Sequence, residues 1–225
     1  MNIKRKQKIF LPNVILLITG LIVITFSVIG ILLLSFEKTQ APTVLNSQSN
    51  EFYVIGKDPT AIQKEKFTEL TKQLNEKEVN YVTVSDLVAQ SFVIDFFNWS
   101  NKDAAYDVGG LQYMFDPSTF NKVAHFDYYQ KVDVFKEAYG SANLPTVKSV
   151  VSKTDSADDY EIEGQMYKAY SSTVKWDYAA ANGIDISKFV SECELLMINV
   201  DGKIVIVEVS MMDNQSVNNG AKQYE

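Results

Sequence analysis

The sequence has very few of the residue types that carry most protein chemistry. Among its 225 residues there is one cysteine and one histidine. Cys193 has no partner for an internal disulfide, and Glu192 and Glu194 on either side of it are expected to raise its pKa. Zinc sites take several Cys and His ligands, so with only Cys193 and His125 we predict no metal site. A serine, threonine or cysteine nucleophile needs a base, and His125 is the only conventional one. We therefore predict no catalytic residue, no cofactor and no enzymatic activity.

Arginine is equally scarce, because Arg5 is the only one in the chain. The rest of the protein has no guanidinium group for bidentate binding of phosphate. Residues 9–225 carry 17 positive and 28 negative side chains, a net charge of −11. Such an acidic surface repels nucleic acid. We predict no nucleic-acid partner.

Apolar residues, in contrast, are concentrated near the start of the chain. Residues 9–36 are a run of 28 without a charge, and a membrane-spanning helix needs about 20. The alternative is a cleaved signal peptide, whose apolar core is about 7–15 residues long and is followed by a small-x-small cleavage site. The run is longer than that, and no such site follows it. We predict a transmembrane helix over residues 9–36, with the lipid bilayer as its partner.

The charges around this run predict its orientation. Four positive side chains precede it, whereas Glu37 and Lys38 after it nearly cancel. The positive-inside rule then places the N-terminus in the cytoplasm and the C-terminal domain outside the cell membrane. The predicted parts are a basic cytoplasmic tail (1–8), the span (9–36), a tether (37–51), an extracytoplasmic domain (52–213) and a disordered tail (214–225).

The first half of the predicted domain has the pattern of helices. Residues 58–60 indicate the start of an amphipathic helix. Residues 85–86 are predicted to cap a second, largely buried helix that reaches about residue 99. Residues 127–138 are predicted to be helical and to end before Gly140.

The second half has the pattern of strands. Residues 146–154 predict a strand, residues 155–159 a polar turn, and residues 160–176 one or two further strands. Two apolar, β-rich runs on either side of Asp201 and Gly202 predict a hairpin with a type I′ turn. Helices followed by antiparallel strands are typical of the α+β class.

This order of elements, over residues 84–212, resembles the NTF2-like (cystatin-like) cone fold. The resemblance implies two or three helices packed on a curved antiparallel sheet. With a cytoplasmic N-terminus and one span, the chain is also similar to the VirB8-like and TcpC-like components of bacterial conjugation machines, which hold other subunits in the envelope. This second resemblance implies an interaction or scaffold module of the bacterial cell envelope, in a conjugation or secretion assembly. Its partners would be other envelope proteins or further copies of itself.

An NTF2-like cone can also hold a small ligand or an active site, so an alternative stays open. In that alternative His125, oriented by Asp127 or Asp133, acts as a general base; otherwise it is a packed or surface histidine beside aromatic residues. Aromatic side chains are favoured in pockets and interfaces. The residues that we expect to line a ligand pocket or an interface are Trp99, Tyr113, Phe120, His125, Tyr128, Tyr129 and Trp176.

Overall fold

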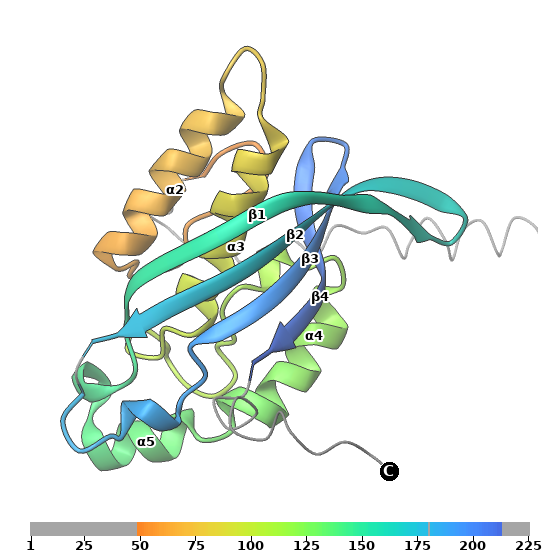
Figure 1. The fold of residues 1–225 in the computed structure, drawn as a ribbon. Helices are drawn as coiled ribbons and strands as arrows, with labels where there is room; N and C mark the ends of the chain where they lie inside the picture. The colour runs from red at the N-terminus through yellow and green to blue at the C-terminus, as the bar shows by residue number, and fades with distance from the viewer. Residues whose placement is uncertain (1–48, 180, 213–225) are drawn as a thin grey trace, which may run out of the picture. The chain divides into compact units, whose positions relative to one another are not determined.

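The computed structural model of the protein describes residues 49–179 and 181–212. They form helices followed by one antiparallel sheet (Figure 1), so the predicted α+β class is confirmed. In chain order the elements are α2 (Ala61–Leu74), α3 (Tyr81–Phe96), the 3-10 turn η1 (Leu111–Tyr113), α4 (Pro117–Ala124), the π-helical turn η2 (His125–Tyr129), α5 (Val132–Tyr139), the 3-10 turn η3 (Ser141–Asn143), β1 (Val147–Ile162), β2 (Gln165–Tyr178), the 3-10 turn η4 (Ile186–Lys188), β3 (Glu192–Val200) and β4 (Lys203–Met211).

The sheet has four antiparallel strands in the order β1-β2-β3-β4, so strands that are neighbours in sequence are also neighbours in space. β1 and β2 pair from one end to the other. β2 pairs with β3 only between Ala169 and Lys175. The end of the β1–β2 hairpin therefore extends beyond β3 as a two-stranded arm (Figure 1).

Two hairpin turns use residues with positive φ. Asp201 and Gly202 have φ of 50° and 90°, as a type I′ turn requires, and the predicted β3–β4 hairpin is confirmed. Glu163 and Gly164, with φ of 51° and 84°, close the β1–β2 hairpin in the same way. The polar turn predicted at residues 155–159 is wrong, because these residues continue β1.

β1 runs through this polar stretch because pairing with β2 satisfies its backbone. Asp155 pairs with Ser171 and Ala157 with Ala169, and a bulge follows before Tyr160. The stretch lacks glycine, which supplies the dihedral angles of a tight hairpin turn at no steric cost. Its aspartates are tolerated because β1 is an edge strand, where charged side chains also discourage pairing with other chains.

α2 begins with a capping box. The Thr60 hydroxyl accepts a hydrogen bond from the Gln63 N–H at 3.3 Å, and the Gln63 side chain accepts one from the Thr60 N–H at 2.7 Å. These two bonds satisfy N–H groups that have no partner within the helix. The helix start was predicted at residues 58–60, and Thr60 is the N-cap of α2.

α3 begins earlier than the sequence pattern predicts. Its N-cap is Asn80, whose side chain accepts hydrogen bonds from two backbone N–H groups of the first turn, at 3.1 and 3.2 Å. Ser85 and Asp86 lie inside the helix, so the predicted cap is wrong. The Asp86 carboxylate instead accepts hydrogen bonds from two hydroxyl groups of β1, at 2.6 and 2.7 Å, and so ties α3 to the sheet.

α4, η2 and α5 follow one another with short breaks. The carboxylate of Asp116 caps α4 by accepting a hydrogen bond from the Thr119 N–H at 3.0 Å, and Pro117 takes the first helical position. The helix predicted at residues 127–138 is divided between η2 and α5. α5 ends at Gly140 as predicted.

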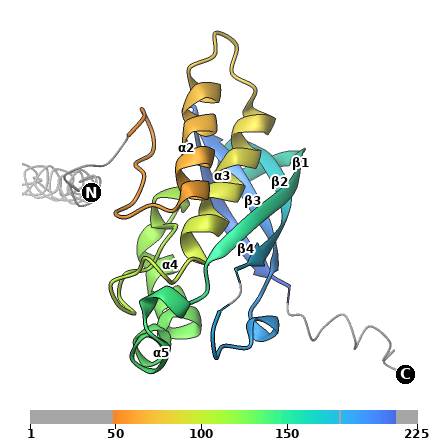
Figure 2. The same ribbon diagram turned by 90° about the vertical axis from the view of Figure 1, so that its left-hand side faces the viewer.

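The main core lies between the helices and one face of the sheet. α3 packs on this face, and α2 runs beside α3 (Figure 2). α3 is buried along most of its length, and its Val88 and Phe92 belong to the same core cluster as Ile204 and Ile206 of β4. Removal of this apolar surface from water, at about 25 cal/mol per Å², holds the helices on the sheet.

The arm packs over the opposite face of the sheet. Val205 lies between two residues of the main core, and because side chains alternate along a strand it faces the other way. It forms a second cluster with Ala169 and Ile198. The Tyr160 hydroxyl of β1 donates a hydrogen bond to the Glu208 carboxylate of β4 at 2.9 Å, which joins the two edge strands of the sheet.

The segment before α2 is fastened to the last strand. The Tyr53 hydroxyl donates a hydrogen bond to the carbonyl oxygen of Ile204 at 2.7 Å and accepts one from the Ile204 N–H at 3.1 Å. Both groups are buried. The beginning and the end of the domain thus share one pair of hydrogen bonds.

None of the helices between residues 49 and 212, residue 180 apart, has the length and apolar character needed to span a bilayer. The span predicted at residues 9–36 lies outside the described residues.

Candidate functional site

An open cavity lies between η2, α5 and the loop that leads into β3. Its volume is about 540 Å³, within the range of small-molecule sites. We call it the α5 cavity. Five of its lining residues are aromatic, and they are Trp99, Tyr128, Phe135, Tyr139 and Phe189. The other lining residues are Asp127, Gln130, Lys131, Gly183, Ile184, Asp185, Lys188 and Val190.

Trp99 forms one wall of this cavity, and its contacts with neighbouring residues hold it in place. Its backbone N–H donates a hydrogen bond to the Pro145 carbonyl oxygen at 2.8 Å. Its ring makes edge contacts with Phe135 and Phe189, with ring centres 6.1 and 5.5 Å apart. Edge-to-face pairs of this kind add about 0.5–1.5 kcal/mol beyond their buried area. The aromatic wall is therefore held in place by its own contacts.

A smaller inner space borders the α5 cavity and shares Trp99 with it. Its volume is about 40 Å³, and Phe96, Phe97 and Tyr178 line it. The Tyr178 hydroxyl donates a hydrogen bond to the Val190 carbonyl oxygen at 2.9 Å, which holds the loop against the sheet. The inner space has room for about one small group of a ligand seated in the α5 cavity.

A second hollow lies between α4 and the end of β4. Its volume is about 330 Å³, and we call it the α4 hollow. It shares Asp127 and Tyr128 with the α5 cavity. Both residues sit on the π-helical turn η2, a feature found frequently at functional sites. The remaining lining residues are Met114, Phe115, Asp116, Thr119, Phe120, Val123, Ile206, Val207, Val209 and Met211.

The two spaces differ in charge. The α5 cavity has lysines and aspartates at its rim, and Lys188 lies 3.6 Å from Asp185. The charged residues that line the α4 hollow are Asp116 and Asp127, both acidic. Hydrogen bonds from the backbone N–H and side chain of Thr119 lower the pKa of Asp116, so this carboxyl group is ionised at neutral pH.

The six aromatic candidates fall into three groups, two of which share Tyr128. Trp99 and Tyr128 line the α5 cavity, and Tyr128 and Phe120 line the α4 hollow. The other three aromatic candidates are buried in the core. Of these, Tyr113 lies 5.3 Å from Tyr53 between ring centres, Tyr129 is fully buried, and Trp176 stacks on Phe97 at 4.2 Å.

His125 lies on η2 but outside the cavities described above. Its Nδ1 is 2.9 Å from the carbonyl oxygen of Ala105, to which it donates in one tautomer. Asp133 accepts a hydrogen bond from the Ala105 N–H at 3.1 Å rather than from the imidazole. The geometry gives the general-base alternative no support, because a base must reach the proton that it abstracts.

Several lining residues escaped the sequence analysis. Phe135 and Tyr139 are four residues apart, so they lie on one face of α5 and both reach the cavity. That spacing was the available signal. Phe189 and Val190 come from a loop distant in sequence, and no local pattern marks them.

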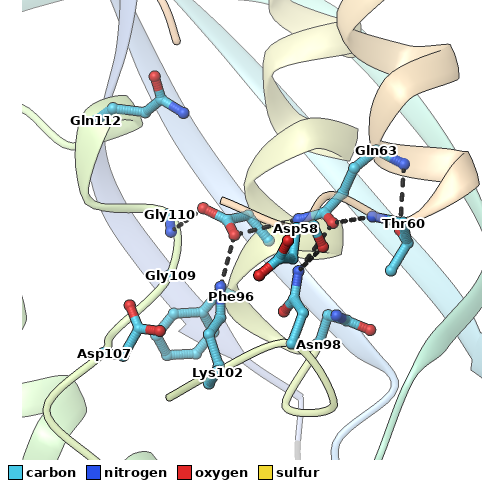
Figure 3. A network of polar contacts seen from close by, with 12 residues as sticks. Asp58, Thr60, Gln63, Phe96, Asn98, Lys102, Asp107, Gly109, Gly110 and Gln112 are labelled. Carbon is cyan, nitrogen blue, oxygen red and sulfur yellow. Dashed lines mark hydrogen bonds and ion pairs between the residues drawn. The ribbon is translucent and has the colours of Figure 1, made fainter. Parts of the chain in front are cut away.

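A buried polar network lies at the C-terminal end of α3 and at first resembles an active site (Figure 3). Asp95 accepts hydrogen bonds from Lys102 Nζ at 2.7 Å, from the Gly110 N–H at 2.7 Å and from the Gln63 side chain at 3.2 Å. The neighbouring cavity is only about 10 Å³, too small for more than one water. The network therefore joins α2, α3 and the loop at residues 109–110, with no room for a substrate.

Cys193 is buried, and burial raises the pKa of its thiol to about 12, with smaller contributions from Glu192 and Glu194. The predicted direction of this shift is confirmed, but removal from water is its main cause. Among the residues whose placement is described, no group of three or more His, Cys, Asp or Glu side chains could hold a metal ion.

No protein-family model matches this chain, and neither a characterised protein nor a solved structure shows significant similarity to it. The two spaces on either side of Tyr128 are therefore the features of this domain that point to a function.

Proposed function

We propose that the protein is a single-pass, membrane-anchored interaction module of the bacterial cell envelope, with a cytoplasmic N-terminus and an NTF2-like extracytoplasmic domain that binds other envelope proteins. The anchor is the apolar run at residues 9–36, and the domain is the α+β unit that follows it in the sequence. A conjugation or secretion assembly is the setting that this organisation suits.

One observation carries the interaction role: two open, largely apolar spaces meet at Tyr128, and apolar side chains remain exposed beside them. Phe115 and Val123 at the α4 hollow are 44% and 51% exposed, and Tyr139 at the α5 cavity is 39% exposed. Clusters of exposed apolar side chains mark interaction sites more often than single ones do. A partner would remove this surface from water.

Site-specific photo-crosslinking in native membranes tests this proposal. A photoreactive amino acid at Val123 is compared with the same group at Val151, which is 66% exposed on β1, far along the sheet from α4. We expect defined adducts with envelope proteins from Val123 and none of the same adducts from Val151. Equal adducts from both positions, or none from Val123, would contradict an interaction role for this surface.

A second candidate function is small-ligand binding in the α5 cavity. Its volume and aromatic walls favour this candidate, since small-molecule sites are concave, mostly apolar and carry a few polar groups. The inner space beside Trp99 would fix the orientation of a flat apolar group. Quenching of tryptophan fluorescence by library compounds, compared between the wild type and Phe135→Ala, separates this function from protein binding at α4.

A further inference from the structure

The α4 hollow has a chemical character that specifies what fills it. Apolar side chains from α4 and β4 form its floor, and they include Phe120, Val123 and Val209. Asp116 and Asp127 stand at its rim, and among the residues that the structure describes no lysine or arginine lines it. An occupant that matches this surface is apolar with a positive charge beside the apolar groups.

The neighbouring edge of β4 adds a backbone contribution. On this edge Met114 forms an isolated parallel bridge with Ile206, and the Phe115 N–H donates a hydrogen bond to the Ile206 carbonyl oxygen at 2.9 Å. Further along, after a bulge at Val207, β4 pairs with β3 on one side from Glu208 to Met211, and no strand within the described part of the chain pairs with its other side. An exposed strand edge offers N–H and C=O groups to an added strand.

The edge and the hollow lie side by side. Val209 and Met211 are two residues apart on β4, and both line the hollow. A strand added to this edge would also place every second side chain over the hollow, because its side chains alternate in the same way. Main-chain hydrogen bonds would then supply affinity and the hollow would supply selectivity.

We infer that the α4 hollow binds an extended segment of a partner protein that adds to the free edge of β4, with apolar side chains at alternate positions and a lysine or arginine between them. This inference rests on the proposed function and names the chemistry of its partner. A second copy of the chain is a poorer match, because residues 9–225 carry a net charge of −11 and the rim is already acidic.

The test uses the full-length protein in detergent micelles and an array of octapeptides. Each peptide carries Leu, Val, Phe or Trp at alternate positions, and the positions between them are Lys, Gln or Glu in three matched series. We expect the lysine series to retain at least about tenfold more protein than the glutamate series. Val123→Glu should remove this binding, and Val151→Glu, also an exposed valine, should leave it unchanged.

A double variant, Asp116→Asn with Asp127→Asn, isolates the charge. Asn caps a helix as well as Asp does, so α4 keeps its N-cap. The preference for lysine over glutamate should fall to within about threefold in this variant, while the preference for apolar side chains stays.

Each other outcome overturns a separate statement. Equal binding of the lysine and glutamate series, still lost in Val123→Glu, would overturn the charge of the partner but keep the docking site. Binding that survives Val123→Glu would overturn the site itself. Crosslinks from Val123 to envelope proteins without any peptide binding would overturn the extended segment and leave the proposed function standing. If Val123 crosslinked only to a second copy of the chain, the inference that the partner is a different protein with a basic segment would be wrong.

Discussion

A β-carbon on Gly109 would collide with the backbone carbonyl oxygen of Asp95. Real side chains never approach so closely, so the loop at residue 109 is packed directly on the backbone of α3. The Gly109 N–H also donates a hydrogen bond to the Tyr129 hydroxyl at 3.0 Å. This contact sets the position of η2, the turn that carries Asp127 and Tyr128.

Gly109→Ala should therefore destabilise the domain by about 3 kcal/mol, because the loop or the end of α3 must move. Gly56→Ala is the matched control, since a β-carbon there meets nothing within 4 Å and should change stability by less than about 0.5 kcal/mol. Urea unfolding of the full-length protein in detergent, followed by tryptophan fluorescence, measures both. Equal stability of the two variants would contradict the close packing.

The buried ion pair of Lys102 and Asp95 should matter far more than an exposed one. The Lys102 side chain is 7% exposed, and its removal leaves the Asp95 carboxylate without its charge partner. Lys102→Met should cost about 3 kcal/mol. Lys57→Met is the control: its pair with Asp103 joins two side chains that are 59% and 58% exposed, and water screens such pairs so well that they contribute little to stability. Similar losses in the two variants would argue against the buried network.

The start of α3 gives a prediction that separates the observed cap from the expected one. Asn80→Ala should destabilise the domain by about 1 kcal/mol, because two N–H groups of the first turn lose their acceptor. Ser85→Ala should be neutral or stabilising, since the Ser85 hydroxyl is buried without a hydrogen-bond partner among the described residues. Thermal unfolding of both variants measures the difference. If Ser85→Ala lost more stability than Asn80→Ala, the N-cap predicted from the sequence at residues 85–86 would be favoured instead.

Cys193 should make the domain less stable in alkali. The pKa of its thiol is about 12 in the folded protein and about 8.5 in an unfolded chain. The folded state thus binds this proton more tightly, so the stabilisation is complete below pH 8.5 and is lost as the pH rises from 8.5 towards 12. Between pH 7 and 9.5, wild type should lose about 1 kcal/mol more stability than Cys193→Val. If the free energies of unfolding of the two proteins changed equally with pH, the pKa of the Cys193 thiol would not be raised by burial.

Local patterns in the sequence predicted the elements whose signal is local. The β3–β4 hairpin follows from Asp201 and Gly202, because few residues other than Asn, Asp and Gly accept two consecutive positive φ angles. The end of α5 at Gly140 is a local signal of the same kind. The turn predicted at residues 155–159 failed because polar residues can mark an exposed edge strand as well as a loop, and only the pairing partner distinguishes them.

The candidate site was less predictable, for a physical reason. An aromatic residue fills a core or lines a cavity according to what lies opposite it, and that neighbour comes from elsewhere in the chain. Trp99 and Trp176 look alike in sequence, yet one borders the α5 cavity and the other stacks on Phe97. The cavity also needs Phe189, from a loop 90 residues after Trp99.

The pair of hydrogen bonds between Tyr53 and Ile204 governs when the domain can fold during synthesis. The two residues are 151 positions apart, and Ile204 and Ile206 lie at the centre of the main core. The helices are made first, but their apolar faces have no cover until β4 has left the ribosome. The N-terminal half therefore cannot complete its core by itself, and the native state forms in one late step when the last strand arrives.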